Sequence, residues 1–255
     1  MEPLFDVRGK RVLITGGSRG IGLMIATGFV EAGASVLIAS RKASVCLEVA
    51  EGLSKLGDCV GVGVDLSAAA GVQLLSDKTE ELWDGRLDVL VNNAGAVWAE
   101  PLETFSEAGW DKVVDINLKS LFFLTQKTLP LLQAAATRAD PARIINIASV
   151  DGIRPPQVET YSYSASKAAV IALTRHLAKR LVDGFINVNA IAPGLFPSKM
   201  TESLMGDEAV LEAIPQRRAG TAEDMAGTAI FLASRASRYV TGQVVAVDGG
   251  ITGLG

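Results

Sequence analysis

RVLITGGSRGIG, residues 11–22, joins a short run of apolar residues to a turn that contains four glycines. Apolar residues at helical spacing follow to about Ala32, so the pattern predicts a strand, a tight turn and a helix. This order is typical of the first half of a dinucleotide-binding unit, in which the helix N-terminus and the glycine main chain receive a pyrophosphate. The spacing is Gly16-x3-Gly20-x-Gly22, and no Gly-Lys-Ser/Thr sequence follows, which argues against a P-loop. A tight turn without a ligand is the alternative interpretation.

Beyond residue 22 the hydrophobic pattern keeps alternating between strand and helix. The expected strands are 11–15, 35–39, 60–64, 87–91, 143–148, 185–191 and 243–247. The helical segments that follow the first one are 43–56, 69–82, 110–132, 163–181 and 222–234. Such alternation predicts an α/β fold with a doubly wound parallel sheet of about seven strands, the Rossmann architecture. No repeat or linker interrupts it, so we expect residues 1–255 to form one domain.

Composition narrows the class of protein. Hydrophobic residues make up 49% of the 255 residues and the net charge is -4, which argues against nucleic acid or an anionic membrane as a partner. No apolar run approaches the length of a membrane span, and the first residues lack the features of a signal peptide. Cys46 and Cys59 have no metal-ligand spacing, and the single His176 excludes a His-rich zinc site. We therefore expect a cytoplasmic protein that binds no metal.

The end of the second strand indicates which dinucleotide is bound. NAD enzymes typically place an acidic residue there, because it accepts a hydrogen bond from the ribose 2′-hydroxyl. Here the sequence is Ser40-Arg41-Lys42, and Arg41 is placed to pair with a 2′-phosphate. Arg19 in the glycine turn is a second suitable cation, so the sequence favours NADP(H). The alternative is that Arg41 and Lys42 are only solvated charges at a strand end.

Polar or small residues follow the later strands, at the edge where parallel sheets bind ligands. Asp65 follows the third strand, and two roles are open: a contact to an adenine amino group, or capping of the next helix together with Ser67. Asn92-Asn93-Ala94-Gly95 follows the fourth strand, Ser149 the fifth and Ala192-Pro193-Gly194 the sixth. Small residues and amides at this edge suit close contact with a flat ligand.

Tyr163 and Lys167 stand four residues apart near the start of a long helical segment. Residues at this spacing share one helix face, so the hydroxyl and the ammonium group can meet. A phenol titrates near ~10, and a fixed cation beside it favours the phenolate and lowers its pKa. We therefore expect a group that exchanges a proton near neutral pH, as carbonyl reduction requires. The alternative is that a tyrosine and a lysine stand at this spacing by chance. Tyr161 has no lysine partner of this kind, because Ala165 stands four residues after it.

Two segments depart from the regular alternation. Asn117 lies inside a helical segment, where asparagine costs stability, so it indicates either a functional role or a capped junction between helices. Residues 195–219 form an irregular insert at the ligand edge, a candidate substrate lid. Its apolar residues include Phe196, Met200, Leu204, Met205, Leu211 and Ile214. They favour a substrate with hydrocarbon character, although packing among the insert's own short helices explains them equally well.

Together these residues resemble the short-chain dehydrogenase/reductase family. The resemblance covers about residues 5–250 and rests on an ordered set of motifs rather than on any single one. The motifs are Thr15-Gly16-x3-Gly20-Ile21-Gly22, Asn92-Asn93-Ala94-Gly95, Asn117, Ser149, Tyr163-x3-Lys167 and Pro193-Gly194. One departure is Ser198, which replaces the usual threonine of the Pro-Gly-x-x-x-Thr stretch and keeps a hydroxyl. The chain also resembles a narrower group that contains the 3-oxoacyl reductases, among them the rhamnolipid-associated reductase.

The resemblance implies a role for each matching residue. Tyr163 would protonate the carbonyl oxygen, Lys167 would lower the pKa of that phenol and bind the nicotinamide ribose, and Ser149 would orient the carbonyl. Asn117 would hold a water in a proton relay. The residues expected to contact the cofactor are Gly16, Ser18, Arg19, Gly20, Ile21, Gly22, Ser40, Arg41, Asp65, Leu66, Asn92, Ala94, Gly95, Tyr163, Lys167, Pro193, Gly194, Phe196 and Ser198.

The sequence therefore predicts an NADPH-dependent reductase of a ketone or 3-oxoacyl carbonyl. Two alternatives stay open: an NAD-dependent sugar or secondary-alcohol dehydrogenase, and a dinucleotide-sensing interaction protein without catalysis. Apolar outer faces at about 118–132 and 163–181 could pack against another subunit, and the resemblance implies a homotetramer or homodimer.

Overall fold

The computed structural model describes residues 4–199, 201–202 and 205–254. Seven strands form one sheet in the order β3-β2-β1-β4-β5-β6-β7, and every neighbouring pair is parallel. The chain starts at the sheet's centre, runs outward to β3, and then returns to build the other half from β4. The expected doubly wound α/β fold is confirmed.

The strands lie close to the segments expected from the sequence. They are β1 (Arg11–Thr15), β2 (Ser35–Ser40), β3 (Cys59–Gly63), β4 (Val89–Asn92), β5 (Ala142–Ile147), β6 (Ile186–Pro193) and β7 (Val244–Val247). The helices are α1 (Gly20–Glu31), α2 (Ala43–Leu53), α3 (Ala69–Leu82), α4 (Glu107–Val114), α5 (Ser120–Ala135), α6 (Tyr161–Leu181), α7 (Glu208–Glu212) and α8 (Ala222–Ala233). The single helix expected over 110–132 is instead two helices joined by a π-helical turn, Asp115–Lys119.

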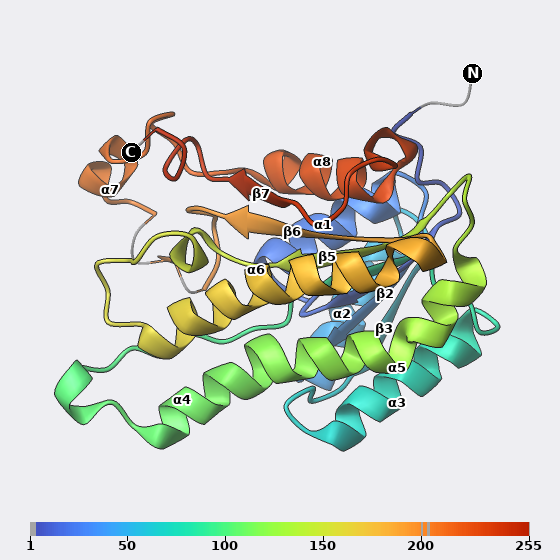
Figure 1. Cartoon of the computed structure of the whole chain (residues 1–255), viewed down its shortest axis with the longest axis horizontal. Helices are drawn as coiled ribbons and strands as arrows, with labels where there is room; N and C mark the ends of the chain where they lie inside the picture. Colours follow the sequence, from blue (N-terminus) through green and yellow to red (C-terminus); the bar gives the residue numbers. More distant parts are fainter. Residues whose placement is uncertain (1–3, 200, 203–204, 255) are drawn as a thin grey trace.

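Helices cover both faces of the sheet (Figure 1). Because side chains alternate along a strand, Val12 and Ile14 pack in one core with α1, α2 and α8, whereas Leu13 packs in another with α3, α5 and α6. Both faces are buried, which explains why the strands read as continuous apolar runs rather than as alternating ones. Among the described residues no helix is both long and apolar enough to cross a membrane.

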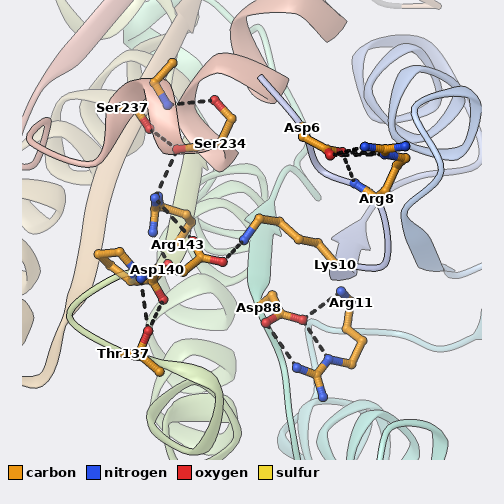
Figure 2. Close-up of polar contacts among 12 residues, drawn as sticks. Asp6, Arg8, Lys10, Arg11, Asp88, Thr137, Asp140, Arg143, Ser234 and Ser237 are labelled. Carbon is orange, nitrogen blue, oxygen red and sulfur yellow. Dashed lines mark hydrogen bonds and ion pairs between the residues drawn. The ribbon is translucent and has the colours of Figure 1, made fainter. Parts of the chain in front are cut away.

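The amino ends of the central strands are fastened by charged side chains (Figure 2). Arg11 pairs with Asp88 at 2.6 Å, and Lys10 pairs with Asp140 at 2.7 Å. Arg143 of β5 is only 1% exposed, and its guanidinium donates at 3.0 Å to the carbonyl oxygen that follows α8. These contacts join β1, β4 and β5 at the amino edge of the sheet. The candidate site residues lie at the opposite, carboxyl edge.

Candidate active site

The glycine turn brings the N-terminus of α1 to the carboxyl edge of β1. Gly16 and Gly20 have φ values of +68° and +52°, a region that other residues rarely adopt. A Cβ on Gly22 would collide with the carbonyl oxygen of Gly16 and with the side-chain amide of Asn93. The residue that caps α1, Arg19, is exposed and makes no side-chain cap hydrogen bond. The first N–H groups of α1 are thus oriented to receive an anion.

Asn93 and Thr15 hold this turn in place. The Asn93 amide donates to the carbonyl oxygens of Thr15 and Gly16 at 2.8 and 3.2 Å. The Thr15 hydroxyl accepts from the main-chain N–H groups of Asn93 and Ala94 at 3.0 and 2.9 Å. Neither side chain was among the residues predicted from the sequence to contact the cofactor. Only their positions, at the ends of adjacent parallel strands β1 and β4, could have revealed them.

Asn92 behaves differently from its neighbour. It is 4% exposed, and its amide donates to Thr125 at 3.2 Å and to Asn146 at 3.0 Å. Its side chain therefore links β4 to α5 and β5 beneath the edge. Ala94 and Gly95 stand at the edge itself, where a Cβ on Gly95 would lie 3.1 Å from the side-chain oxygen of Asn117.

The residues after β2 and β3 include Arg41, expected to pair with a 2′-phosphate, and Asp65, expected to contact adenine or to cap the next helix. Arg41 is exposed and lies near enough to Asp65 for its charge to lower the pKa of that carboxyl group, although hydrogen bonds from Ser67 lower it more. Ser67 donates to Asp65 from its N–H and its hydroxyl at 3.0 and 2.8 Å. Asp65 therefore forms a local turn, whereas Ala68 caps α3 without a side-chain bond. Leu66 is buried in the core, and the buried Ser40 hydroxyl has no partner among the described residues.

Tyr163 and Lys167 lie on one face of α6, as predicted, with the Lys167 Nζ 5.6 Å from the centroid of the Tyr163 ring. The prediction that the phenol becomes more acidic is wrong. Burial raises the pKa of Tyr163 to about 12, although a hydrogen bond with Ser149 opposes the rise, and the charge of Asp151 raises it further. Burial also lowers the pKa of Lys167 to about 8, and its ammonium group donates to the Ile147 carbonyl oxygen at 2.7 Å. Loss of hydration outweighs the attraction between the two side chains.

Ser149 lies two residues beyond the end of β5 and forms a hydrogen bond with the Tyr163 hydroxyl. It is 7% exposed, and its Oγ accepts a hydrogen bond from the N–H of Asp151 at 3.1 Å. Because a main-chain donor occupies one acceptor position of Oγ, the hydroxyl proton is directed away from the turn. Ser149 can therefore donate to an oxygen placed beside Tyr163.

Asn117 lies in the π-helical turn between α4 and α5 and is 2% exposed. Its side-chain oxygen accepts from the Ala96 N–H at 2.8 Å, and its amide donates to the Ala96 carbonyl at 3.0 Å and to Ser166 on α6 at 3.0 Å. The hydrogen bonds to Ala96 and to Ser166 on α6 offset the cost of placing an asparagine inside a helix. A π-turn inside an α-helix frequently marks a functional site. The capped junction offered as the alternative does not occur, because the helix continues through the turn.

The segment after β6 returns to the glycine turn. A Cβ on Gly20 would lie 3.3 Å from the Cβ of Ser198, so the first part of the insert sits over the N-terminus of α1. Pro193 ends β6, and the N–H of Gly194 donates to the carbonyl oxygen of Val247 at 2.9 Å. Ser198 thus comes together with the other cofactor candidates.

The apolar residues of the insert divide into two groups. Phe196 is 2% exposed and Ile214 is 4% exposed, so both belong to the core, and Gly220 packs on the Phe196 ring. Met205 and Leu211 are partly exposed. Met200 and Leu204 lie outside the described residues. The N–H of Gly220 donates to the Leu195 carbonyl oxygen at 2.9 Å, which joins the two ends of the insert.

Comparisons with known proteins find similar oxidoreductases. A family model described as enoyl-(acyl carrier protein) reductase matches residues 16–252. The rhamnolipids biosynthesis 3-oxoacyl-[acyl-carrier-protein] reductase of Pseudomonas aeruginosa is 49% identical over 98% of this chain and 99% of that protein. The 2-dehydro-3-deoxy-D-gluconate 5-dehydrogenase of Dickeya dadantii is 39% identical over 96% of each chain. The structure of the Pseudomonas aeruginosa RhlG/NADP active-site complex matches with a TM-score of 0.95 and 48% identity, covering 99% of this chain and 100% of that one.

Proposed function

This chain belongs to the short-chain dehydrogenase/reductase family and is an oxidoreductase, and from that premise we propose that it transfers a hydride from NADPH to the ketone of a 3-oxoacyl-type substrate. The observation that carries the proposal is that Ser149, Tyr163 and Lys167 lie together at the carboxyl edge of the sheet, the edge from which α1 also begins.

The residues present fit NADP. A side chain at Gly22 would collide with the Gly16 carbonyl oxygen and the Asn93 amide, so the glycine turn keeps its tight shape only with glycine at this position. The N-terminus of α1 has no side-chain cap, so its N–H groups suit the pyrophosphate. Arg19, which precedes α1, and Arg41, which follows β2, are exposed cations that would hold the 2′-phosphate. The bound cofactor supplies the hydride, and the remaining steps belong to side chains.

Tyr163 serves as the proton donor. With its pKa raised to about 12, the phenol stays protonated throughout the neutral range, so it gives its proton only as negative charge develops on the carbonyl oxygen. Ser149 donates a second hydrogen bond to the same oxygen and fixes its position. The Lys167 ammonium group lies 5.6 Å from the centroid of the Tyr163 ring, donates to the Ile147 carbonyl oxygen, and would bind the nicotinamide ribose.

Asn117 positions the α4–α5 segment against α6. Because its side chain already bonds Ala96 and Ser166, a relay water at this place would bind its main-chain carbonyl rather than its amide. An Asn117→Ala variant with an unchanged rate and unchanged stability would contradict this role.

Tyr163→Phe tests the mechanism, with Tyr161→Phe as its matched control. Tyr161 is exposed on the same helix turn and donates to Glu159 at 2.8 Å, away from Ser149. We expect Tyr163→Phe to lower kcat for NADPH oxidation by about 10²–10⁴ while NADPH binding stays near normal, because only proton transfer is lost. Tyr161→Phe should keep its rate. A Tyr163→Phe enzyme that retained most of its activity would rule out the mechanism.

A substrate panel tests the reaction class. The relatives include both a 3-oxoacyl reductase and a gluconate-type dehydrogenase, so the panel holds 3-oxoacyl esters, cyclic ketones and sugar acids with NADPH or NADH. We expect reduction of 3-oxo esters with NADPH. Turnover of sugar acids alone would favour the dehydrogenase alternative.

The insert at residues 195–219 is proposed to be the substrate lid. Its base is fixed by Phe196 and Gly220, while Met205 and Leu211 remain partly exposed above it. Leu211→Asp should raise KM for long-chain 3-oxo esters more than for short ones. An equal effect on both would argue against a lid that contacts the acyl chain.

We also propose that the protein is a cytoplasmic homodimer or homotetramer. Phe122 and Phe123 on α5 are 38% and 43% exposed, and Ala165, Ala168 and Ala172 form a small apolar face on α6. Sedimentation of the wild type and of Phe123→Glu tests this assembly, which a monomeric wild type would contradict. Cell fractionation tests the location.

A further inference from the structure

Asp151 occupies a turn that links Ser149 to the catalytic helix. Its N–H donates to the Ser149 Oγ at 3.1 Å, within the 3₁₀ turn Val150–Gly152. That turn packs directly on α6, since a Cβ on Gly152 would lie 2.6 Å from the main-chain carbon of Lys167. Asp151 is therefore held beside the Ser149 and Tyr163 hydroxyls that receive the substrate carbonyl.

The Asp151 side chain is half-buried, and its charge acts on Tyr163. Burial raises the pKa of this carboxyl group and the charge of Arg154 opposes the rise, but the Arg154 guanidinium donates to the Ile251 carbonyl oxygen at 2.9 Å. Within the described part of the chain, no hydrogen bond or ion pair engages the Asp151 carboxylate. Other partly buried carboxylates are engaged, for example Asp88 with Arg11 and Asp248 with Thr252.

We propose that Asp151 determines substrate specificity by excluding ketones that carry a negative charge beside the reacting carbonyl. The inference rests on the proposed function and names its substrate class: neutral 3-oxo esters and thioesters rather than 3-oxo acids or sugar acids. Two like charges, one of them on a half-buried carboxylate, repel each other more strongly than in water. A neutral ester beside the same carboxylate meets no such penalty, because it places no second negative charge in the pocket.

Acetoacetate and ethyl acetoacetate are suitable probes, because they share the reacting ketone and differ in charge. Acetoacetate, a carboxylic acid with an ordinary pKa near 4, is ionised at about pH 8, and kcat/KM is measured there with saturating NADPH. This pH is set well above the ordinary carboxyl range because burial raises the pKa of Asp151. The variant is Asp151→Asn, which keeps the size of the side chain and the main-chain N–H that Ser149 accepts. Asp183→Asn is the control, because Asp183 is exposed at the opposite edge of the sheet and changes the net charge equally.

We expect the wild type to prefer the ester, and Asp151→Asn to reduce that preference at least about tenfold, a difference of about 1.4 kcal/mol. The change should come from a higher kcat/KM for acetoacetate. The ester should stay within about threefold of wild type, because it places no second negative charge beside Asp151. Asp183→Asn should keep the wild-type ratio.

The outcomes separate the inference from the function on which it rests. If the wild type reduces the ester and Asp151→Asn leaves the ratio unchanged, or slows both probes equally, the inference is wrong and the function stands. If the wild type oxidises NADPH with neither probe nor any member of the ketone panel, both fail. Should Asp151→Asn unfold below the assay temperature, Asp151→Ser is measured under the same criteria.

Discussion

Gly22→Ala should weaken both the fold and NADPH binding through a single methyl group. The new Cβ would collide with the Gly16 carbonyl oxygen, which is main chain, and with the Asn93 amide, which two hydrogen bonds hold in place. Asn93 would have to withdraw from its two hydrogen bonds, at 2.8 and 3.2 Å, to the main chain of Thr15 and Gly16. The strand end, the turn and the start of α1 would then separate.

The size of the effect follows from these contacts. Two hydrogen bonds at about 0.5–1.5 kcal/mol each give a loss of about 1–3 kcal/mol in the free energy of unfolding. In a chain of this length each kcal/mol lowers Tm by about 2–4 °C. Displacement of the α1 N–H groups should raise the Kd for NADPH at least about tenfold, because the anion loses aligned donors.

Gly227→Ala is the matched control. Gly227 lies in α8, is exposed, and a Cβ there would meet no atom within 4 Å. Replacing a glycine inside a helix with alanine stabilises it by about 0.5–1 kcal/mol, and the affinity for NADPH should not change. Thermal unfolding and fluorescence titration with NADPH measure both variants. A Gly22→Ala protein with wild-type Tm and wild-type affinity would refute the assignment of the turn.

Three further predictions concern the charged residues of the site. Because the pKa of Lys167 is lowered to about 8, kcat/KM should fall as the pH rises through about 8, and a flat profile to pH 10 would contradict this. Between about pH 8 and the ordinary lysine value near 10.4 the unfolded state binds more protons than the folded state, so the free energy of unfolding rises with pH across this window and is lowest below it. Lys167→Met removes the buried charge, so it should abolish activity yet raise the free energy of unfolding at pH 7 by about 1–3 kcal/mol, measured by urea titration. Arg41→Ala should raise the Kd for NADPH about tenfold or more and leave NADH nearly unchanged, with Lys42→Ala as the neighbouring control; equal losses for both cofactors would refute the assignment of Arg41.

Most of the fold could be predicted from the sequence because the central strands are buried on both faces. Apolar runs such as residues 12–14 identify buried strands without tertiary knowledge, and β1 and α3 have the predicted bounds. The helix over 110–132 was less predictable. Its periodicity continues through the π-turn at Asp115–Lys119, and only the bonds of Asn117 to Ala96 and Ser166 show why the turn occurs.

The chemistry of the site was harder to predict than its location. Helical spacing placed Tyr163 and Lys167 together correctly, but the direction of the Tyr163 pKa depends on burial, which spacing does not report. In the same way, Phe196 reads as a ligand contact in sequence and is a core residue in the structure. Asn93 and Asp151 were not singled out, because their roles depend on contacts between segments far apart in the chain.

The bond between Gly220 and Leu195 has a consequence for how this enzyme can change. The Gly220 N–H donates to the Leu195 carbonyl oxygen at 2.9 Å, so the two ends of the 195–219 insert are joined, and the Phe196 ring packs against Gly220 at this point. A loop whose ends are already fixed becomes costlier only with the logarithm of its length, about 0.6 kcal/mol for each doubling. The interior of the insert can therefore be lengthened, shortened or replaced by that of a relative, while the sheet stays as it is.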